Sequence, residues 1–388
     1  MSVEIRKVGS RKELALFAEY PNVLYKGNPY YVPTIAAEDV KIFDRGHNAA
    51  YEFCDADFFL AYKDGGIVGR VAAIINPRAN EAWGKKNARF GWLDFIDDRE
   101  VSSALMKTVT DWSLARGMDH LEGPLGFTDF DTEGMLVEGF EELGTSVTFY
   151  NHPYYMEHLE AMGFTKNTDW VERRITLPEA VPEKISRISV LVAEKYGLKA
   201  VSYTRREVRK LDIGHKLFEL INNTYNVLYG YSVLSDRQVD QYVDLYLSML
   251  DLRLVTFIND SEGNLIAFGV MVPSLSTALQ KCGGKMFPFG WYHMARALYL
   301  KKTDTVDMLL IAVRKDYQSR GVPSMIINDL LPRLKEYGFK YAETNPELET
   351  NNAVQNLWSD FPNRQHRRRR IYGRPLLSGG SDGAAESC

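Results

Sequence analysis

Two halves of this chain share one order of expected elements, which limits the fold more than any single motif does. A hairpin expected at Phe58–Ile75 has a counterpart of similar length at Leu254–Val272. The segment Arg116–Glu122 likewise matches Tyr337–Glu343 as a helix end, a glycine and a strand that closes on glutamate. The order strand, helices, hairpin, strand, turn, helix, strand, helix, strand occurs twice, which indicates two copies of one α/β unit.

Length and composition agree with two domains. The chain has 388 residues, more than one hydrophobic core usually organises, and 45% of them are hydrophobic. The segment Thr176–Lys184 contains two prolines and is typical of a linker. We therefore expect an N-terminal domain over residues 1–177 and a C-terminal domain over residues 183–376. The small and polar residues 377–388 predict a disordered tail.

Charge and cysteine content argue against several classes of protein. The net charge of −4 gives no overall attraction to nucleic acid or to an anionic membrane. The 3 cysteines are far apart, and the histidines are scattered, so neither a disulfide framework nor a metal site is predicted. No apolar run approaches the roughly 20 residues that cross a bilayer, and the first residues lack the apolar core of a signal peptide. We expect a cytoplasmic protein with no metal and no membrane partner.

One dense basic run, Arg364–Arg370, could favour binding to nucleic acid in spite of the net negative charge. In a nucleic-acid-binding protein such a run contacts phosphates. The alternative is the end of an edge strand, whose cations keep neighbouring strands away or attract an acidic substrate. The net charge and the lack of a nucleic-acid motif favour this second interpretation.

The most informative stretch of the second half is residues 306–331. An apolar run at Met308–Val313 predicts a buried strand, and a polar turn leads from it to a helix that begins near Val322. The first backbone N–H groups of a helix have no partner, so a glycine-bearing turn at this place can hold an anion. The corresponding turn of the first half, Ile96–Glu100, has no glycine and three acidic residues, which would repel a phosphate.

The spelling Gln318-Ser-Arg-Gly321-Val-Pro323 resembles the Q/R-x-x-G-x-G/A signature of GNAT-superfamily acyltransferases, which hold the pyrophosphate of acyl-coenzyme A there. Pro323 stands where the family usually has Gly or Ala. The element order of each half is also similar to a GNAT domain, and tandem GNAT folds occur in the family. The resemblance implies an α/β (α+β) fold of two GNAT-like domains, each a mixed, mostly antiparallel sheet flanked by helices, with a degenerate first domain.

The resemblance implies acetyl-CoA or another acyl-CoA as cosubstrate. In the family, a helix patterned N-x-x-A-x-x-L-Y follows the next strand, and its Tyr protonates the leaving thiolate. Here Asn351–Trp358 fits the spacing, but Trp358 replaces the Tyr, and an indole N–H cannot act as an acid near neutral pH. The residues that the resemblance assigns to the cosubstrate are Ala312, Val313, Arg314, Gln318, Ser319, Arg320, Gly321, Val322, Ser324 and Asn351.

Carboxylates supply the candidates for catalysis. A base must reach the amine directly or through water, and the acidic segment after the strand at Tyr341–Thr344 is close to the expected cleft. The alternative is a set of solvated loop charges. That alternative is stronger for the first-half counterparts Asp129, Asp131 and Glu133. The candidate catalytic residues are Glu343, Glu347 and Asp307, and the candidate substrate-binding residues are Asn345, Glu349 and Tyr292, the last from an aromatic insert at Ser274–Leu300.

The sequence therefore favours an acyl-CoA-dependent N-acyltransferase acting on a small-molecule or peptide amine. The alternative is a GNAT-like protein that binds a ligand or partner without catalysis, as the missing Tyr suggests. A third interpretation is an aminoacyl or long-chain acyl transferase.

Overall fold

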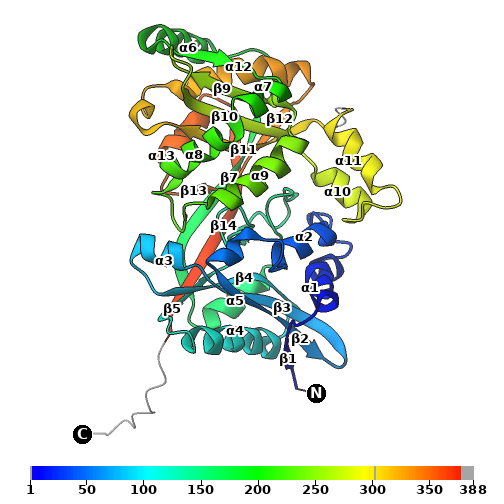
Figure 1. The fold of residues 1–388 in the computed structure, drawn as a ribbon. Helices are drawn as coiled ribbons and strands as arrows, with labels where there is room; N and C mark the ends of the chain where they lie inside the picture. Colours follow the sequence, from blue (N-terminus) through cyan, green and yellow to red (C-terminus); the bar gives the residue numbers. More distant parts are fainter. Residues whose placement is uncertain (1, 301–302, 377–388) are drawn as a thin grey trace, which may run out of the picture.

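The computed structural model describes residues 2–300 and 303–376, so the expected tail at 377–388 lies outside the described residues. The described strands form a sheet of 14 strands, most of them antiparallel, with helices packed on both faces (Figure 1). This confirms the predicted fold class. None of the described helices is long and apolar enough to cross a membrane.

The first half contains seven strands and five α-helices. The expected hairpin is present, and its turn places Asp64 and Gly65 at φ values of 52° and 82°, which a tight hairpin requires. The strands are β1 (Glu4–Lys7), β2 (Asp55–Lys63), β3 (Gly66–Ile75), β4 (Asn87–Phe95), β5 (His120–Gly123), β6 (Met135–Glu138) and β7 (Thr165–Thr176), and the helices are α1 (Arg11–Leu24), α2 (Ala36–Phe43), α3 (Pro77–Trp83), α4 (Arg99–Leu114) and α5 (Tyr154–Ala161).

The second half repeats this order with more helices. Two of these helices, over residues 205–210 and 213–225, are separated at Asp212, which adopts a left-handed conformation. The strands are β8 (Lys199–Val201), β9 (Val255–Asn259), β10 (Leu265–Pro273), β11 (Thr305–Val313), β12 (Tyr341–Thr344), β13 (Glu347–Leu348) and β14 (Asn363–Pro375), and the helices are α6 (Glu183–Tyr196), α7 (Arg205–Lys210), α8 (Ile213–Tyr225), α9 (Asp236–Met249), α10 (Ser276–Cys282), α11 (Gly290–Leu298), α12 (Val322–Glu336) and α13 (Asn352–Gln355).

The two halves exchange their last strands. The strand order is β1-β2-β3-β4-β5-β14-β7-β12-β11-β10-β9-β8, so β14 of the second half lies beside β5 of the first, and β7 of the first half pairs with β12 of the second. In Figure 1 these two long strands run side by side through the middle of the molecule. The halves therefore share one continuous sheet.

This position makes the edge-strand interpretation of the basic run Arg364–Arg370 wrong. The arginine side chains on both faces of β14 meet acidic side chains of neighbouring strands. Arg367 and Arg369 are each 1% exposed. Both guanidinium groups contact the carboxylate of Glu172 on β7, with a distance of 2.6 Å from Nε of Arg367. The run belongs to an interior ion network because its neighbours supply the countercharges.

The second half is built as two layers of helices around its part of the sheet. On one face, α6 and α12 pack through a core that includes Val192, Ile326 and Leu330. On the other face, α8 and α9 pack through a core that includes Phe218 and Val239. These two layers matter for the site, because one cavity reaches both of them.

Candidate functional site

A gap in the sheet lies between β11 and β12. The two parallel strands pair only where Thr305–Met308 faces Tyr341–Thr344. β12 ends there, whereas β11 continues to Val313. The side chain of Asn345 spans the start of the gap, and its Nδ2 donates a 2.9 Å hydrogen bond to the carbonyl of Leu309.

One further carbonyl of this free edge is held by a side chain. The hydroxyl of Tyr225, at the end of α8, donates to the carbonyl of Ile311 over 2.9 Å. Beyond Met308 the edge of β11 thus faces side chains and open space instead of a strand. An extended ligand can run along such an edge and hydrogen-bond to it as a further strand would.

A cavity of about 320 Å³ occupies the gap and passes through the sheet. Ile326 and Ile327 of α12 line it on one face, and Phe218 and Tyr225 of α8 line it on the other. Most of the remaining lining is apolar, with few polar side chains at defined places. A mainly apolar cavity of this kind is typical of a small-molecule site.

The glycine-bearing turn lies at the end of β11. Gly321 has a φ of 80° and is the N-cap of α12, and no side chain within the described residues caps that helix. A Cβ on Gly321 would lie 3.0 Å from Ile188 and 3.2 Å from Val192, so a larger residue fits poorly here. Of the first turn, the N–H of Val322 remains available to an anion, because Pro323 has no N–H and the N–H of Ser324 bonds to the carbonyl of Gly321.

The cations of this turn differ in availability. Arg314 pairs with Asp316 at 2.8 Å, and Lys315 donates to Asn226. Arg320 lies over the rings of Tyr196 and Tyr317 and forms no ion pair within the described chain. Among the predicted cosubstrate residues, Arg320 is thus the cation best placed to meet an anion.

The corresponding helix of the first half is already capped. The carboxylate of Asp98 accepts a hydrogen bond from the N–H of Glu100 at the start of α4. It also pairs with Lys63 at 2.6 Å. A side chain of the protein itself thus fills the position that an anion would take.

The other predicted cosubstrate residues divide between strand, turn and cavity. Asn351 lines the cavity and caps α13, and Val322 is buried in the core. Gln318 donates its amide to the carbonyl of Val313, and the N–H of Ser324 bonds back to Gly321. The remaining residues lie in β11 or in the turn, namely Ala312 in β11 and Ser319 in the turn.

Glu347 is the candidate catalytic residue that lines the cavity. Its Oε1 accepts a 2.7 Å hydrogen bond from Nε1 of Trp358, and its Oε2 has no hydrogen-bond partner among the described residues. Burial raises the pKa of Glu347 to about 7, against the opposing effects of Trp358 and Arg173. The carboxyl group can therefore give and take a proton near neutral pH.

Three carboxylates of the first half line the same cavity. Asp129, Asp131 and Glu133 come from the loop between β5 and β6. Both oxygens of Asp129 and Oε2 of Glu133 are buried and accept no hydrogen bond from any described residue, so the interpretation as solvated loop charges is wrong. Burial raises the pKa of Asp129 to about 7 and that of Asp131 to about 6. Only the close spacing of three acids could have drawn attention to them in the sequence.

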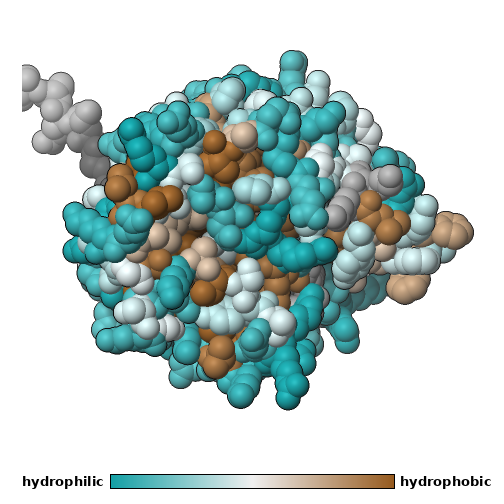
Figure 2. All heavy atoms as spheres, turned by 90° about the horizontal axis from the view of Figure 1, so that it is seen from above, coloured by the Kyte–Doolittle hydropathy of each residue, from teal (hydrophilic) through white to brown (hydrophobic). Residues whose placement is uncertain are grey.

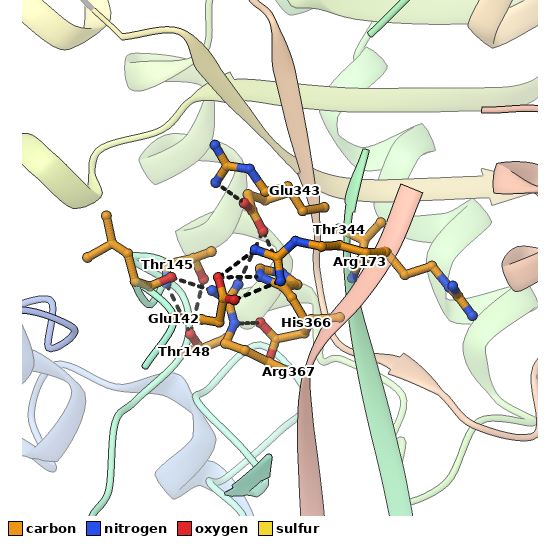
Figure 3. Close-up of polar contacts among 12 residues, drawn as sticks. Glu142, Thr145, Thr148, Arg173, Glu343, Thr344, His366 and Arg367 are labelled. Atoms are coloured by element: carbon orange, nitrogen blue, oxygen red, sulfur yellow. Dashed lines mark hydrogen bonds and ion pairs between the residues drawn. The ribbon is translucent and has the colours of Figure 1, made fainter. Parts of the chain in front are cut away.

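Glu343 and Asp307 do not line the cavity. Glu343 pairs with Arg174 at 2.8 Å, lies 2.7 Å from Nε2 of His366 and meets Arg367 at 3.4 Å (Figure 3). Asp307 is buried beside the same network, and burial raises its pKa to about 7. Both carboxylates lie among the charges where β7, β12 and β14 meet.

The predicted substrate-binding residues lie in three different places. Asn345 lines the cavity. Glu349 is engaged outside it, in ion pairs with Lys166 at 2.6 Å and Arg368 at 3.1 Å. Tyr292 lies on α11 and is exposed. The structure thus brings Asn345, Glu347 and Asn351 together at the cavity. Glu349 and Tyr292 lie outside it.

Comparison with solved structures identifies the fold. A tandem GNAT protein from the clavulanic acid biosynthesis pathway superposes over 98% of this chain and 100% of its own, with a TM-score of 0.57 at 12% identity. A GCN5-related N-acetyltransferase from Sphaerobacter thermophilus covers 97% and 96% of the two chains, with a TM-score of 0.52 at 11% identity. The chain therefore has the tandem GNAT fold, as the repeat predicted.

Two curated proteins of similar length are also similar to this chain in sequence. No family model matches the chain. Protein YghO of Escherichia coli (strain K12) is 24% identical over 381 residues, which span 96% of this chain and 95% of that protein. A bacterial ceramide synthase of Caulobacter vibrioides is 24% identical over 377 residues, which span 94% and 95% of the two chains.

Proposed function

We propose that the protein is an acyl-CoA-dependent N-acyltransferase whose thioester lies in the gap between β11 and β12. The observation that carries this proposal is the cavity that crosses the sheet through that gap. One of its walls is α12, whose uncapped start can hold phosphate groups. The family resemblance assigns Ala312 and Val313, at the end of β11, to the pantetheine arm.

The phosphates would lie at residues 318–322, beside Arg320. The fit is good for the anion, because the helix N-terminus and a cation act together. It is weaker in one respect, since Pro323 supplies no N–H and the N–H of Ser324 bonds to the carbonyl of Gly321. The apolar walls at Ile326 and Ile327 suit an acyl chain or the uncharged part of the arm.

Amide formation needs proton transfer at two places. The amine nitrogen loses protons as it attacks the thioester carbonyl carbon, and the departing thiolate gains one. Glu347 is suited to exchange a proton there, because its pKa lies near neutrality. Trp358 orients that carboxyl group through its N–H and is not itself an acid.

The relative from Caulobacter vibrioides suggests a lipid amide as product. A ceramide is the amide of a long-chain amino alcohol, and that protein is named as a ceramide synthase. The apolar cavity supports the same class here, since it suits alkyl chains better than polar peptides. We therefore place long-chain acyl-CoA and a long-chain amine ahead of acetyl-CoA and a peptide.

Calorimetry tests the cosubstrate. Wild-type protein is titrated with acetyl-CoA and with dodecanoyl-CoA, alongside Gly321→Glu and Gly338→Glu. Both glycines have positive φ, but Gly338 lies at the other end of α12 with open space around it. We expect binding in the wild type and in Gly338→Glu and its loss in Gly321→Glu. No binding in the wild type, or equal binding in Gly321→Glu, contradicts the proposal.

A second candidate function is a binding protein without catalysis, and Trp358 in place of the usual Tyr favours it. Mass spectrometry of the products from dodecanoyl-CoA and a panel of amines separates the two. Binding of acyl-CoA with neither amide formation nor thioester hydrolysis would support the second candidate.

A further inference from the structure

We propose that Asp129 and Glu133 of the first half bind the ammonium group of a long-chain amine acceptor and receive its proton. This inference rests on the proposed function. It gives the first half, which lacks the phosphate-binding turn, a direct part in the site that the second half forms.

The first argument is that these carboxylates lack a partner. Both oxygens of Asp129 and one of Glu133 are buried in the cavity wall with no hydrogen bond from the described chain. A buried carboxylate without a donor is costly, and native proteins keep such groups where a ligand completes them. A charged amine supplies three donors and the missing positive charge.

Burial raises the pKa of both carboxyls and the charge of Arg89 lowers it, but Arg89 does not fill this need by contact. The guanidinium group of Arg89 donates to the backbone carbonyls of Gly126, Phe127 and Gly230, at 2.9–3.3 Å. It forms no ion pair with Asp129 or Glu133 within the described chain. Arg89 thus holds the loop in place and leaves the two carboxylates free for a cation from outside.

The second argument is the apolar wall beside the carboxylates. Phe130, between them in sequence, stacks on Tyr242 at a ring distance of 4.8 Å and contacts Phe218 of α8 at 5.7 Å. Phe218 and Leu217 line the cavity there. A charged end next to a hydrocarbon wall fits an alkylamine, whereas a polar amine would leave the wall without contacts.

The third argument is the side of the sheet on which they lie. Because Phe130 packs against α8, the carboxylates are on the α8 face, and the phosphate-binding turn belongs to α12 on the opposite face. Donor and acceptor would then meet in the gap from opposite sides. Glu347 and its partner Trp358 lie at the gap, with Trp358 in the core on the α12 face.

The protons balance in this arrangement. An ammonium carries three protons, and the amide nitrogen of the product keeps one. The first passes to the Asp129–Glu133 pair before the nitrogen attacks the carbonyl carbon and the C–N bond forms. When the C–S bond breaks, its electron pair stays on sulfur, and the second proton leaves nitrogen and reaches the thiolate through Glu347. The pair then releases its proton to solvent.

Binding of n-dodecylamine, measured by calorimetry below its micelle concentration, tests the inference, with 1-dodecanol as the uncharged control. We compare the wild type with Asp129→Asn, Glu133→Gln and the double variant. Asp57→Asn is the matched control, because Asp57 is a buried first-half carboxylate that pairs with Lys7 away from the cavity. We expect the double variant to bind the amine at least about tenfold more weakly than the wild type, and Asp57→Asn to bind it as the wild type does.

Dodecanoyl-CoA binding and turnover separate the failure of this inference from failure of the proposed function. The double variant should bind dodecanoyl-CoA as the wild type does and should raise KM for the amine with a displaced pH profile. Unchanged amine affinity in a folded double variant overturns the inference while leaving the proposed function intact. Amine binding that needs Asp129 and Glu133, in a protein that binds no acyl-CoA, overturns the proposed function alone.

A different observation carries a second inference, about the insert at α10 and α11. The base of the insert is fixed to the first half, because Nε2 of Gln280 donates to the carbonyls of Pro29 and Tyr31. Its tip protrudes from the molecule at the right of Figure 1. Phe287 and Phe289 there are 82% and 71% exposed. In Figure 2 hydrophobic residues lie among hydrophilic ones at the protruding right end of the molecule.

We infer, against the expectation from the sequence of no membrane partner, that this tip docks on a bilayer with anionic headgroups. The large exposed side chains include Trp291 and Tyr292, aromatic types that favour the membrane interface. The exposed cations Lys281 and Lys285 flank the same tip and complement anionic lipids. Single exposed apolar residues are ordinary, but so many in one protruding segment mark an interaction surface.

Vesicle sedimentation tests this inference, with phosphatidylcholine alone and mixed with phosphatidylglycerol. Phe287→Ser/Phe289→Ser should lose binding to the mixed vesicles, whereas Leu16→Ser/Val23→Ser, at exposed apolar positions of α1, should retain it. Equal binding by all three proteins, or none by the wild type, overturns the inference. So does a dimer that the Phe substitutions dissociate, since the tip would then bind a second copy of the chain.

Discussion

Nε1 of Trp358 donates a 2.7 Å hydrogen bond to Oε1 of Glu347 inside the cavity that crosses the sheet. The indole thus supports a titratable carboxyl group at the place where the family resemblance led us to expect a tyrosine acid. The pair makes the pKa of Glu347, which burial raises to about 7, sensitive to the residue at position 358.

Trp358→Phe should raise the pKa of Glu347 further. Burial raises this pKa, and the hydrogen bond from Trp358 lowers it, so loss of the bond leaves burial less opposed. If the carboxylate form is needed, the acidic limb of the kcat/KM profile moves to higher pH. The profile and a ¹³C NMR titration of Glu347 measure the change.

Trp83→Phe is the control for this substitution, because the N–H of Trp83 donates to the carbonyl of Tyr231 and does not contact Glu347. An acidic limb that stays in place in Trp358→Phe would contradict the assignment. Loss of one buried hydrogen bond should also cost about 1–3 kcal/mol of unfolding free energy in Trp358→Phe.

Glu172→Gln should destabilise the protein strongly. Glu172 is buried between Arg367 and Arg369. Removal of its negative charge takes this countercharge away from two buried guanidinium groups. Breaking such a buried group by removing one member costs about 3–5 kcal/mol. Urea unfolding followed by circular dichroism measures the loss as a lower midpoint.

Glu138→Gln provides the contrast. Glu138 of β6 pairs with Arg368 of β14 at 3.2 Å, but the Glu138 side chain is 60% exposed. Surface pairs contribute about 0–1 kcal/mol, so this variant should unfold close to the wild type. Equal effects of the two substitutions would mean that the interior network does not stabilise the strand exchange.

The same network shows where prediction from sequence stops. The hairpins, the repeat and the turn at Gly321 depend on residues close in sequence, and local patterns predicted them. The neighbours of β14 depend on pairing between strands that are far apart in sequence, which no local pattern encodes. Arg367 and Arg369 looked like surface charges because arginine is seldom buried without a partner, and their partner Glu172 comes from the other half.

The candidate site divides in the same way. Glu347, Asn345 and Asn351, which line the cavity, were predicted as site residues because they follow the strand that borders the gap. Asp129 and Glu133 were set aside as loop charges, since nothing in their sequence tells that a cavity wall from the second half covers them. When two repeats each contribute residues to a site, the sequence pattern of one repeat predicts only the residues of that repeat.

The folding stability should fall as the pH rises through about 7. Burial raises the pKa of Asp129 and of Glu347 to about 7, above the values of the unfolded chain. Protonated carboxyls therefore contribute stability that is fully present below the unfolded pKa and is lost as pH passes the folded pKa. Thermal unfolding in a series from pH 5 to pH 8.5 measures the slope.

Asp129→Asn should flatten this slope, because the amide cannot ionise. It should also unfold at a higher temperature than the wild type near pH 8, where the wild type must bury a charge. Glu172 gives the opposite dependence: burial would raise its pKa, but Arg367 and Arg369 outweigh burial and lower it to about 2. Its contribution is present above the unfolded pKa and is lost as the pH falls through about 2.

When the connection between the halves is cut, the two fragments should stay associated as one folded protein. Residues 177–182 join β7 to α6, and Glu179 and Ala180 are exposed there, so a protease site inserted between them is accessible. β14 lies between β5 and β7, and β7 also pairs with β12, so each fragment supplies an interior strand to the other. The nicked protein should elute at the size of the intact chain, and its fragments should separate only in denaturant and then fail to fold singly. Fragments that part under native conditions and keep their secondary structure would show that the halves fold as independent domains without the exchange.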